Sequence, residues 1–160
     1  MKAVELVKVY HPSIESLRDV TVEMLEQYVL PVNGMVYKRS RFVVDEMARL
    51  NDACNYLENN DIASLGECMF ETHEGLRHQY EVSCKELDFL VNFVKDKPEV
   101  LGARMMGGGF GGCTINLVQE EAIAQLISDI KPAYEDAINL PLDFYIASIE
   151  NGTEIIQAIK

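Results

Sequence analysis

A run of glycines is the part of this sequence best suited to binding a ligand. Five of the ten glycines lie at residues 107–112, within the segment MMGGGFGGCT. Glycine is retained where the backbone φ angle must be positive, or where a ligand or a second backbone must approach closely. Two interpretations follow: a loop that lets a ligand or a second backbone come close, and a hairpin whose glycines only let two strands turn.

The common nucleotide-binding motifs do not account for this run. Gly107, Gly109 and Gly112 have the G-x-G-x-x-G spacing, but that fingerprint needs a helix directly after it, and the following residues TINLV predict a strand. A Walker A loop needs Lys-Ser or Lys-Thr after the glycines, and the sequence has neither there. Both motifs are excluded, while the hairpin and the ligand loop stay open.

The histidines do not predict a metal site. A zinc protease helix carries two histidines four residues apart on one face, whereas His73 and His78 are five residues apart, about 140° round a helix. His73 falls on an apolar helical stripe, so we expect it to be a buried core residue. The sequence also lacks a G-x-S-x-G nucleophile elbow and distinguishes no Asp or Glu as an acid or base. We therefore assign no catalytic residue and no metal ligand in this chain.

Helices are predicted over most of the first half of the chain. Thr21 can cap one that ends near Pro31, and Asp61 can cap another. Between them, from Val36, a core-facing stripe is predicted at helical spacing: Val43, Met47, Leu50, Cys54 and Leu57. The helix after Asp61 carries a similar face: Ile62, Leu65, Met69, His73, Leu76 and Tyr80.

The second half predicts a small sheet. Ser83 and Glu86 predict a capping box for a helix that ends at Pro98. Residues 100–106 and 113–118 then predict two strands on either side of the glycines, followed by a helix that opens at Glu120. Residues 142–147 alternate as a third strand. This order predicts an α+β domain, with a helical N-terminal half packed on one face of a small sheet.

Charge and composition narrow the possible partners. The chain has 160 residues and a formal net charge of −12, which repels phosphate backbones and anionic membranes, so we expect neither nucleic acid nor membrane as a partner. Because the sequence has no apolar run of membrane-spanning length and no secretory signal, we expect a cytoplasmic protein.

The cysteines form no C-x-x-C pair, and we expect them to be buried apolar residues: Cys54, Cys68, Cys84 and Cys113.

Three segments, taken together and in order, resemble one enzyme family. They are residues 17–21 (LRDVT), residues 73–88 (from HEGLR to YEVSCKELD) and residues 102–114 (GARMMGGGFGGCT). From about residue 12 onward the chain resembles the carboxyl-terminal half of the galactokinases, a branch of the GHMP sugar and metabolite kinases. The glycine segment resembles the third conserved motif of that superfamily.

The resemblance implies a fold and a reaction. Residues 1–160 would form a ferredoxin-like GHMP kinase carboxyl-terminal domain with a mostly antiparallel sheet. The sugar-binding and phosphate-binding motifs and the catalytic aspartate of the amino-terminal domain are absent from this sequence. With ATP and Mg²⁺, the full-length parent would phosphorylate galactose at its anomeric hydroxyl to give galactose 1-phosphate, in a cleft between the two domains.

Within that resemblance the glycine loop lies beside the cleft, where its lack of side chains lets substrates come close. The residues carried over to this role are Met106, Gly107, Gly108, Gly109, Phe110, Gly111 and Gly112. Met106 stands where relatives often have threonine, so this place has no hydroxyl to offer a substrate.

Two alternatives stay open beside the kinase hypothesis. Because it lacks the catalytic motifs, the chain by itself is expected to be inactive and to bind no cofactor tightly. It could instead be a stand-alone binding or regulatory module that keeps the kinase fold, or its parent could phosphorylate another sugar such as N-acetylgalactosamine. A module would present a well-packed surface, whereas a domain without its partner domain would expose an apolar patch.

Overall fold

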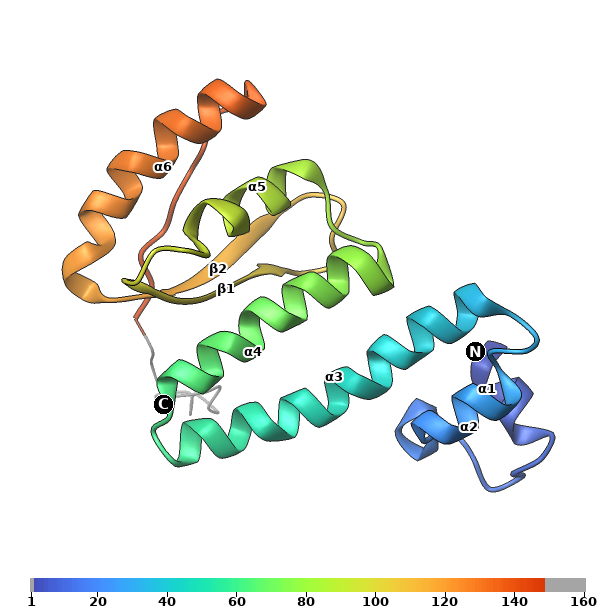
Figure 1. Cartoon of the computed structure of the whole chain (residues 1–160). Helices are drawn as coiled ribbons and strands as arrows, with labels where there is room; N and C mark the ends of the chain where they lie inside the picture. Colours follow the sequence, from blue (N-terminus) through green and yellow to red (C-terminus); the bar gives the residue numbers. More distant parts are fainter. Residues whose placement is uncertain (1, 149–160) are drawn as a thin grey trace, which may run out of the picture.

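The computed structural model describes residues 2–148. The regular elements are α1 (Lys2–Lys8), α2 (Val22–Tyr28), α3 (Gly34–Glu58), α4 (Ile62–Gly75), α5 (Lys85–Val94), β1 (Val100–Met106), β2 (Cys113–Val118) and α6 (Ile123–Ile138). Helices α4 and α5 lie along the two-stranded antiparallel sheet, while α1 and α2 lie away from the sheet beside α3 (Figure 1). Short turns of other helical types are η1 (Leu17–Asp19), η2 (Leu76–Tyr80) and η3 (Glu120–Ala122). The α+β class is confirmed, as are both strands that flank the glycines.

Two predicted helix caps are confirmed, because the side chains bond the first free amides of their helices. Thr21 accepts a hydrogen bond from the Met24 amide at 3.3 Å, and Asp61 accepts one from the Ser64 amide at 3.1 Å. Asn33, which the sequence indicates only as part of a turn with Gly34, caps the long helix α3 by accepting a hydrogen bond from the Val36 amide. These caps fix where α2, α3 and α4 begin.

The capping box predicted at residues 83–86 is wrong. Helix α5 begins one residue later, with Cys84 as its N-cap and no side-chain cap bond. The Ser83 hydroxyl instead donates to Asp88 at 2.5 Å. A carboxylate is a stronger acceptor than a neutral group. Because Asp88 lies in the first turn of α5, Ser83 is tied to a side chain of that turn rather than to a free backbone amide of the helix.

The buried apolar side chains form two clusters. One joins α1, α2 and the segment between them: Ala3, Val4, Val7, Ile14, Val20, Leu25 and Val29. The other lies where α4, α5 and α6 meet β1: Phe70, Val91, Val94, Val100, Ala103 and Leu126. Helices α1 and α2, which carry residues of the first cluster, lie at one end of α3, while α4 runs alongside the sheet (Figure 1).

Helix α4 and strand β1 touch backbone to backbone. A Cβ atom on Gly66 would collide with the Leu101 carbonyl oxygen, and one on Gly102 would lie 2.6 Å from the Gly66 Cα. Only glycine at both positions allows this approach. The contact sets the depth at which α4 lies against β1 and so helps to place His73 further along α4.

The stripe predicted on the long helix α3 faces the core only in part. Leu50 and Leu57 are 64% and 55% exposed, and Cys54 is exposed as well. Helix α4 packs instead against the face that carries Glu46 and Arg49, which contact Thr72 and Glu71 by polar bonds. The helical spacing was correct, but the neighbouring helix lies on another face.

The third strand predicted at residues 142–147 is wrong. These residues have no strand partner in the part of the chain that the structure describes, and Tyr145 and Ile146 are 91% and 68% exposed. The segment turns back after α6, where the Leu142 amide donates to the Glu135 side chain. Alternating polarity makes a strand possible, but a strand forms only where a neighbour completes its hydrogen bonds.

The cysteines are free thiols, as their spacing suggests, but the expectation that they are buried is wrong. Cys54 and Cys113 are exposed, and Cys68 and Cys84 are partly buried. Cys54 lies on the exposed face of α3, and Cys113 is the first residue of β2. No helix among residues 2–148 is long and apolar enough to cross a lipid bilayer.

Candidate functional site

The glycine run forms the connection between β1 and β2. The strands pair as far as Met106 and Cys113, and the six residues between them make the loop. Positive φ angles occur in this loop at Gly107, Gly109, Phe110, Gly111 and Gly112. The predicted hairpin turn therefore accounts for four of the five glycines through their backbone conformation.

Gly108 is different from the other glycines of this loop. Its φ angle lies outside the positive region, and a Cβ atom built on it would meet nothing within 4 Å. Neither backbone strain nor packing within the described part of the chain requires glycine here. The hairpin alone therefore does not explain this glycine, and the ligand-loop interpretation stays open for it, since a bare backbone can admit a group from outside.

The loop is anchored to the segment that joins η2 to α5. The Phe110 amide donates to the Val82 carbonyl oxygen at 2.7 Å, and a Cβ atom on Gly109 would collide with that same oxygen. Beyond this anchor Phe110 carries a φ of 60° and a side chain that is 77% exposed. A strained, exposed aromatic next to a bare backbone is a combination found at binding sites.

His73 is buried beside the start of the loop, which confirms the prediction that it belongs to the core. Its Nδ1 accepts a hydrogen bond from the Met105 amide at 3.2 Å. Burial lowers the pKa of His73, although the nearby Asp88 and Glu74 charges act in the opposite direction. The ring is therefore neutral at pH 7, with its proton on Nε2, which lies 3.3 Å from Asp88 Oδ1 without the alignment of a hydrogen bond.

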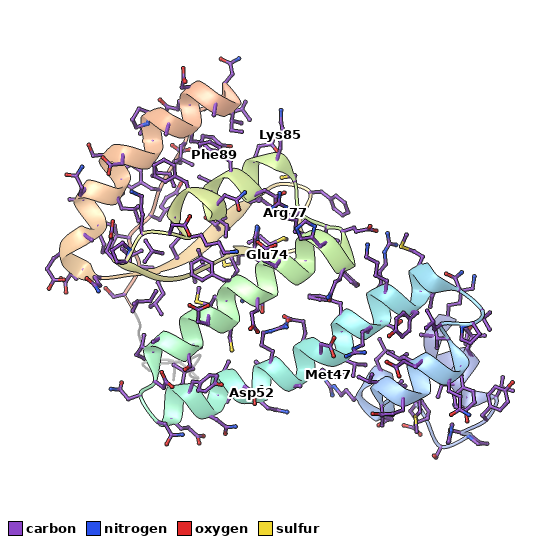
Figure 2. The ribbon with its side chains drawn as sticks, viewed as in Figure 1. Met47, Asp52, Glu74, Arg77, Lys85 and Phe89 are labelled. Carbon is purple, nitrogen blue, oxygen red and sulfur yellow. The ribbon has the colours of Figure 1, made fainter. Side chains whose placement is uncertain are left out.

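Asp88 on α5 gathers three side chains from three parts of the chain. Its Oδ1 accepts the Ser83 hydroxyl and faces His73, and its Oδ2 lies 3.0 Å from Arg77 Nε. Arg77 extends from η2 toward α5 (Figure 2). We refer to His73, Arg77, Ser83 and Asp88 as the Asp88 network.

The segment that anchors the loop is also held from α3. Glu81 has a φ of 62°, and its carboxylate lies 2.9 Å from Lys38 and 3.3 Å from Arg39. Hydrogen bonds from these two cations lower the pKa of Glu81. The Val82 amide closes the turn by donating to the Leu76 carbonyl oxygen.

Two of the three segments that carry the family resemblance meet at this site. Residues 73–88 supply the Asp88 network, and residues 102–114 supply the loop, whereas residues 17–21 lie apart, in η1 and the start of α2. The segments HEGLR and YEVSCKELD contain all four residues of the network, but their spacing alone did not predict that these side chains meet. The network's signal was the recurrence of polar residues in segments that otherwise build a core.

The site can shape a binding surface but contributes little charge. Residues 106–112 contain no charged side chain and no nucleophile. Among residues 2–148 no group of three or more His, Cys, Asp or Glu side chains could hold a metal ion. Neutralising charge for a reaction at this loop would have to come from groups beyond it.

Comparison with known proteins gives a family for this arrangement. The family model described as GHMP kinases C terminal matches residues 53–136, which include the Asp88 network and the glycine loop. The matched part covers both strands and α4 and α5.

Individual relatives agree with the family model. Galactokinase from Thermotoga neapolitana is 39% identical over 141 residues, which cover 88% of this chain and 39% of that protein. Galactokinase from Bos taurus is 37% identical over 142 residues, which cover 89% of this chain and 35% of that protein. The crystal structure of Lactococcus lactis galactokinase complexed with galactose superposes with a TM-score of 0.82 at 31% identity, over 92% of this chain and 39% of that one. The chain thus spans well under half the length of these relatives.

Proposed function

The chain belongs to the GHMP kinases as a galactokinase-like carboxyl-terminal part, and from this we propose that it serves as the carboxyl-terminal domain of a galactokinase. In this proposal residues 1–160 make one side of a cleft whose other side is an amino-terminal domain that binds sugar and phosphate. The complete enzyme transfers the γ-phosphoryl group of ATP to the anomeric hydroxyl of galactose. Mg²⁺ supplies charge neutralisation for that transfer.

The observation that carries the proposal is the bare backbone at Gly108. Its own chain neither strains nor crowds this position, so the absence of a side chain is useful only to a group that approaches from outside. Phosphoryl transfer depends chiefly on the positioning of reactants and on electrostatic stabilisation. A rigid, uncharged loop fits the first of these needs.

The same loop supports the expectation that the chain alone is inactive. Met106 to Gly112 offer shape and backbone groups, but neither a base for the sugar hydroxyl nor a cation for the phosphates. In the proposed enzyme the amino-terminal domain and Mg²⁺ supply these groups. The carboxyl-terminal domain contributes the surface against which the reactants are held.

A chimera tests the proposal. This chain would replace the matching part of Thermotoga neapolitana galactokinase, and galactose-dependent release of ADP would be measured for the chimera and for the chain alone. We expect activity only from the chimera, and we expect Gly108→Ala to lower kcat/KM by about tenfold to a hundredfold, because small displacements of reactants cost rates of that order.

Gly34→Ala is the matched control. Gly34 also has open space around its Cβ position, but it lies at the first residue of α3, remote in sequence from the loop. Its substitution should leave kcat/KM unchanged. ADP release by the chain alone, or full activity of the Gly108→Ala chimera, would contradict the proposal.

A further inference from the structure

We propose that Asp88 is a positioning residue for the glycine loop, acting through Ser83, Arg77 and His73. The inference rests on the proposed function only in taking residues 107–112 as the part that meets substrates. The described bonds and ion pairs of Asp88 go to Ser83, Arg77 and His73, and its effect on the loop would pass through these residues along two paths.

The first path runs through residues 77–83, the segment that anchors the loop. Asp88 holds Ser83 by a 2.5 Å hydrogen bond and Arg77 by a 3.0 Å ion pair, and these two residues flank Glu81 and Val82 on both sides. Hydrogen bonds to a charged acceptor are among the stronger ones in proteins. The Asp88 carboxylate therefore fixes the ends of a turn whose middle is strained at Glu81.

That turn then fixes the loop. The Val82 carbonyl oxygen accepts the Phe110 amide at 2.7 Å, and the same carbonyl lies where a Gly109 side chain would be. A displacement of Val82 would therefore be passed on to Gly109 and Phe110. Gly108, the exposed glycine directly before Gly109, would be displaced with it.

The second path runs through His73 to the other end of the loop. His73 Nε2 faces Asp88 at 3.3 Å, while its Nδ1 accepts the Met105 amide one residue before Met106, where the loop begins. Asp88 thus affects the position of Met105, directly before the loop, as well as the positions of Gly109 and Phe110 within it. An apolar residue at position 88 could keep helix α5 intact, but it could make the contacts of neither path.

Hydrogen exchange of single amides, measured by NMR on the 160-residue chain, tests this positioning. The Phe110 amide reports the anchor directly, because it is the donor to Val82. The amide of Leu25, a residue of the other core cluster, donates to the Thr21 carbonyl oxygen and reports opening of the domain away from the loop. We expect Asp88→Asn and Ser83→Ala to speed Phe110 exchange by about tenfold, the change that loss of a hydrogen bond to a charged group produces in an opening equilibrium.

Two further variants separate positioning from general destabilisation. Ser83→Thr keeps the hydroxyl and should restore the exchange rate of Phe110. Asp96→Asn makes the same chemical change at an exposed aspartate just beyond the end of α5, and should leave it unaltered. Unchanged Phe110 exchange in Asp88→Asn and Ser83→Ala, or an equal acceleration at Leu25, would overturn the proposal. If Asp88→Asn does not fold, Ser83→Ala and Ser83→Thr still decide it.

The chimera described above provides the kinetic readout. In it, Asp88→Asn should lower kcat about tenfold with the KM for galactose little changed, since an interaction that aligns reactants affects the transition state more than binding. An unchanged kcat would contradict a positioning role. If the unsubstituted chimera released no ADP, the proposed function would fail, while the exchange measurement would still decide whether Asp88 orders the loop.

Discussion

Glycine serves two different purposes in neighbouring parts of this domain. At Gly66 and Gly102 the backbones of α4 and β1 are in contact, and a side chain on either residue would collide with the opposing backbone. At Gly108 a side chain would meet nothing within 4 Å. The first pair is explained by the chain's own packing, whereas the described part of the chain does not explain the second position, where we propose that a group from outside approaches.

The surroundings of the two places differ in the same way. The Gly66 contact lies beside buried Val100 and Ala103, so it is part of an apolar core. The loop is held by the hydrogen bond from the Phe110 amide to the Val82 carbonyl oxygen, in a segment whose neighbours Arg77 and Ser83 bond Asp88, and these bonds are directional. Directional bonds can fix the position of a loop that has no core of its own.

The largest effect in this comparison is expected from Gly66→Ala. The new Cβ would be forced into the Leu101 carbonyl group, so α4 and β1 must separate. We expect the free energy of unfolding to fall by about 3 kcal/mol, the upper part of the range for overpacking, despite the gain in helix propensity. Urea denaturation followed by circular dichroism measures this change.

Glu67→Ala is the control for that measurement. Glu67 is the next residue on α4 and is exposed, so its replacement should change the free energy of unfolding by no more than about 0.5 kcal/mol. Equal stability of Gly66→Ala and the unsubstituted chain would mean that the close contact of α4 with β1 is not required, and the contrast with Gly108 would disappear.

Local features of this fold were predictable from sequence, because they depend on residues close together in the chain. Thr21 and Asp61 cap helices a few residues away, and the two strands follow from alternation on either side of the glycines. The buried position of His73 followed from its place on an apolar stripe. Each of these depends on helical or strand periodicity.

Features that depend on a distant partner were not predictable in the same way. Gly66 and Gly102 are far apart in sequence, and nothing local indicates that they touch. The exposed stripe on α3 and the unpaired residues 142–147 have correct periodicities without the neighbours that would bury or pair them. The Asp88 network joins residues 73, 77, 83 and 88, whose order in sequence does not show which side chain faces which.

A smaller effect is expected from the titration of His73. Its pKa in the folded chain lies below its ordinary value of 6.5 because burial disfavours the charged ring, with Arg77 acting in the same direction and Asp88 and Glu74 against it. As the pH falls below 6.5, His73 in the unfolded chain binds a proton that it does not bind in the folded chain. The free energy of unfolding should therefore be highest above pH 6.5 and should decrease below it. Urea midpoints measured from about pH 7.5 down to about pH 5.5 would show this slope above the range in which carboxylates titrate.

His73→Gln identifies the source of that slope. Glutamine can accept the Met105 amide but does not titrate, so the variant should have a flatter dependence of stability on pH, whatever its absolute stability. A slope as steep as that of the unsubstituted chain would assign it to other groups and would contradict the neutral, buried histidine at the base of the loop.

The smallest change in stability is expected at Gly108, and it is the most informative of the three. Gly108→Ala adds a methyl group that meets no atom of the described chain and needs no positive φ, so the free energy of unfolding should stay within about 0.5 kcal/mol. Alanine also reduces the entropy of the unfolded chain, which favours a slight gain rather than a loss. A loss comparable to that of Gly66→Ala would mean that the chain itself needs glycine at this position, and the reason to expect an external group there would be gone. Unchanged stability together with reduced kcat/KM in the chimera would separate the two uses of glycine, since the same substitution would then harm only what the loop binds.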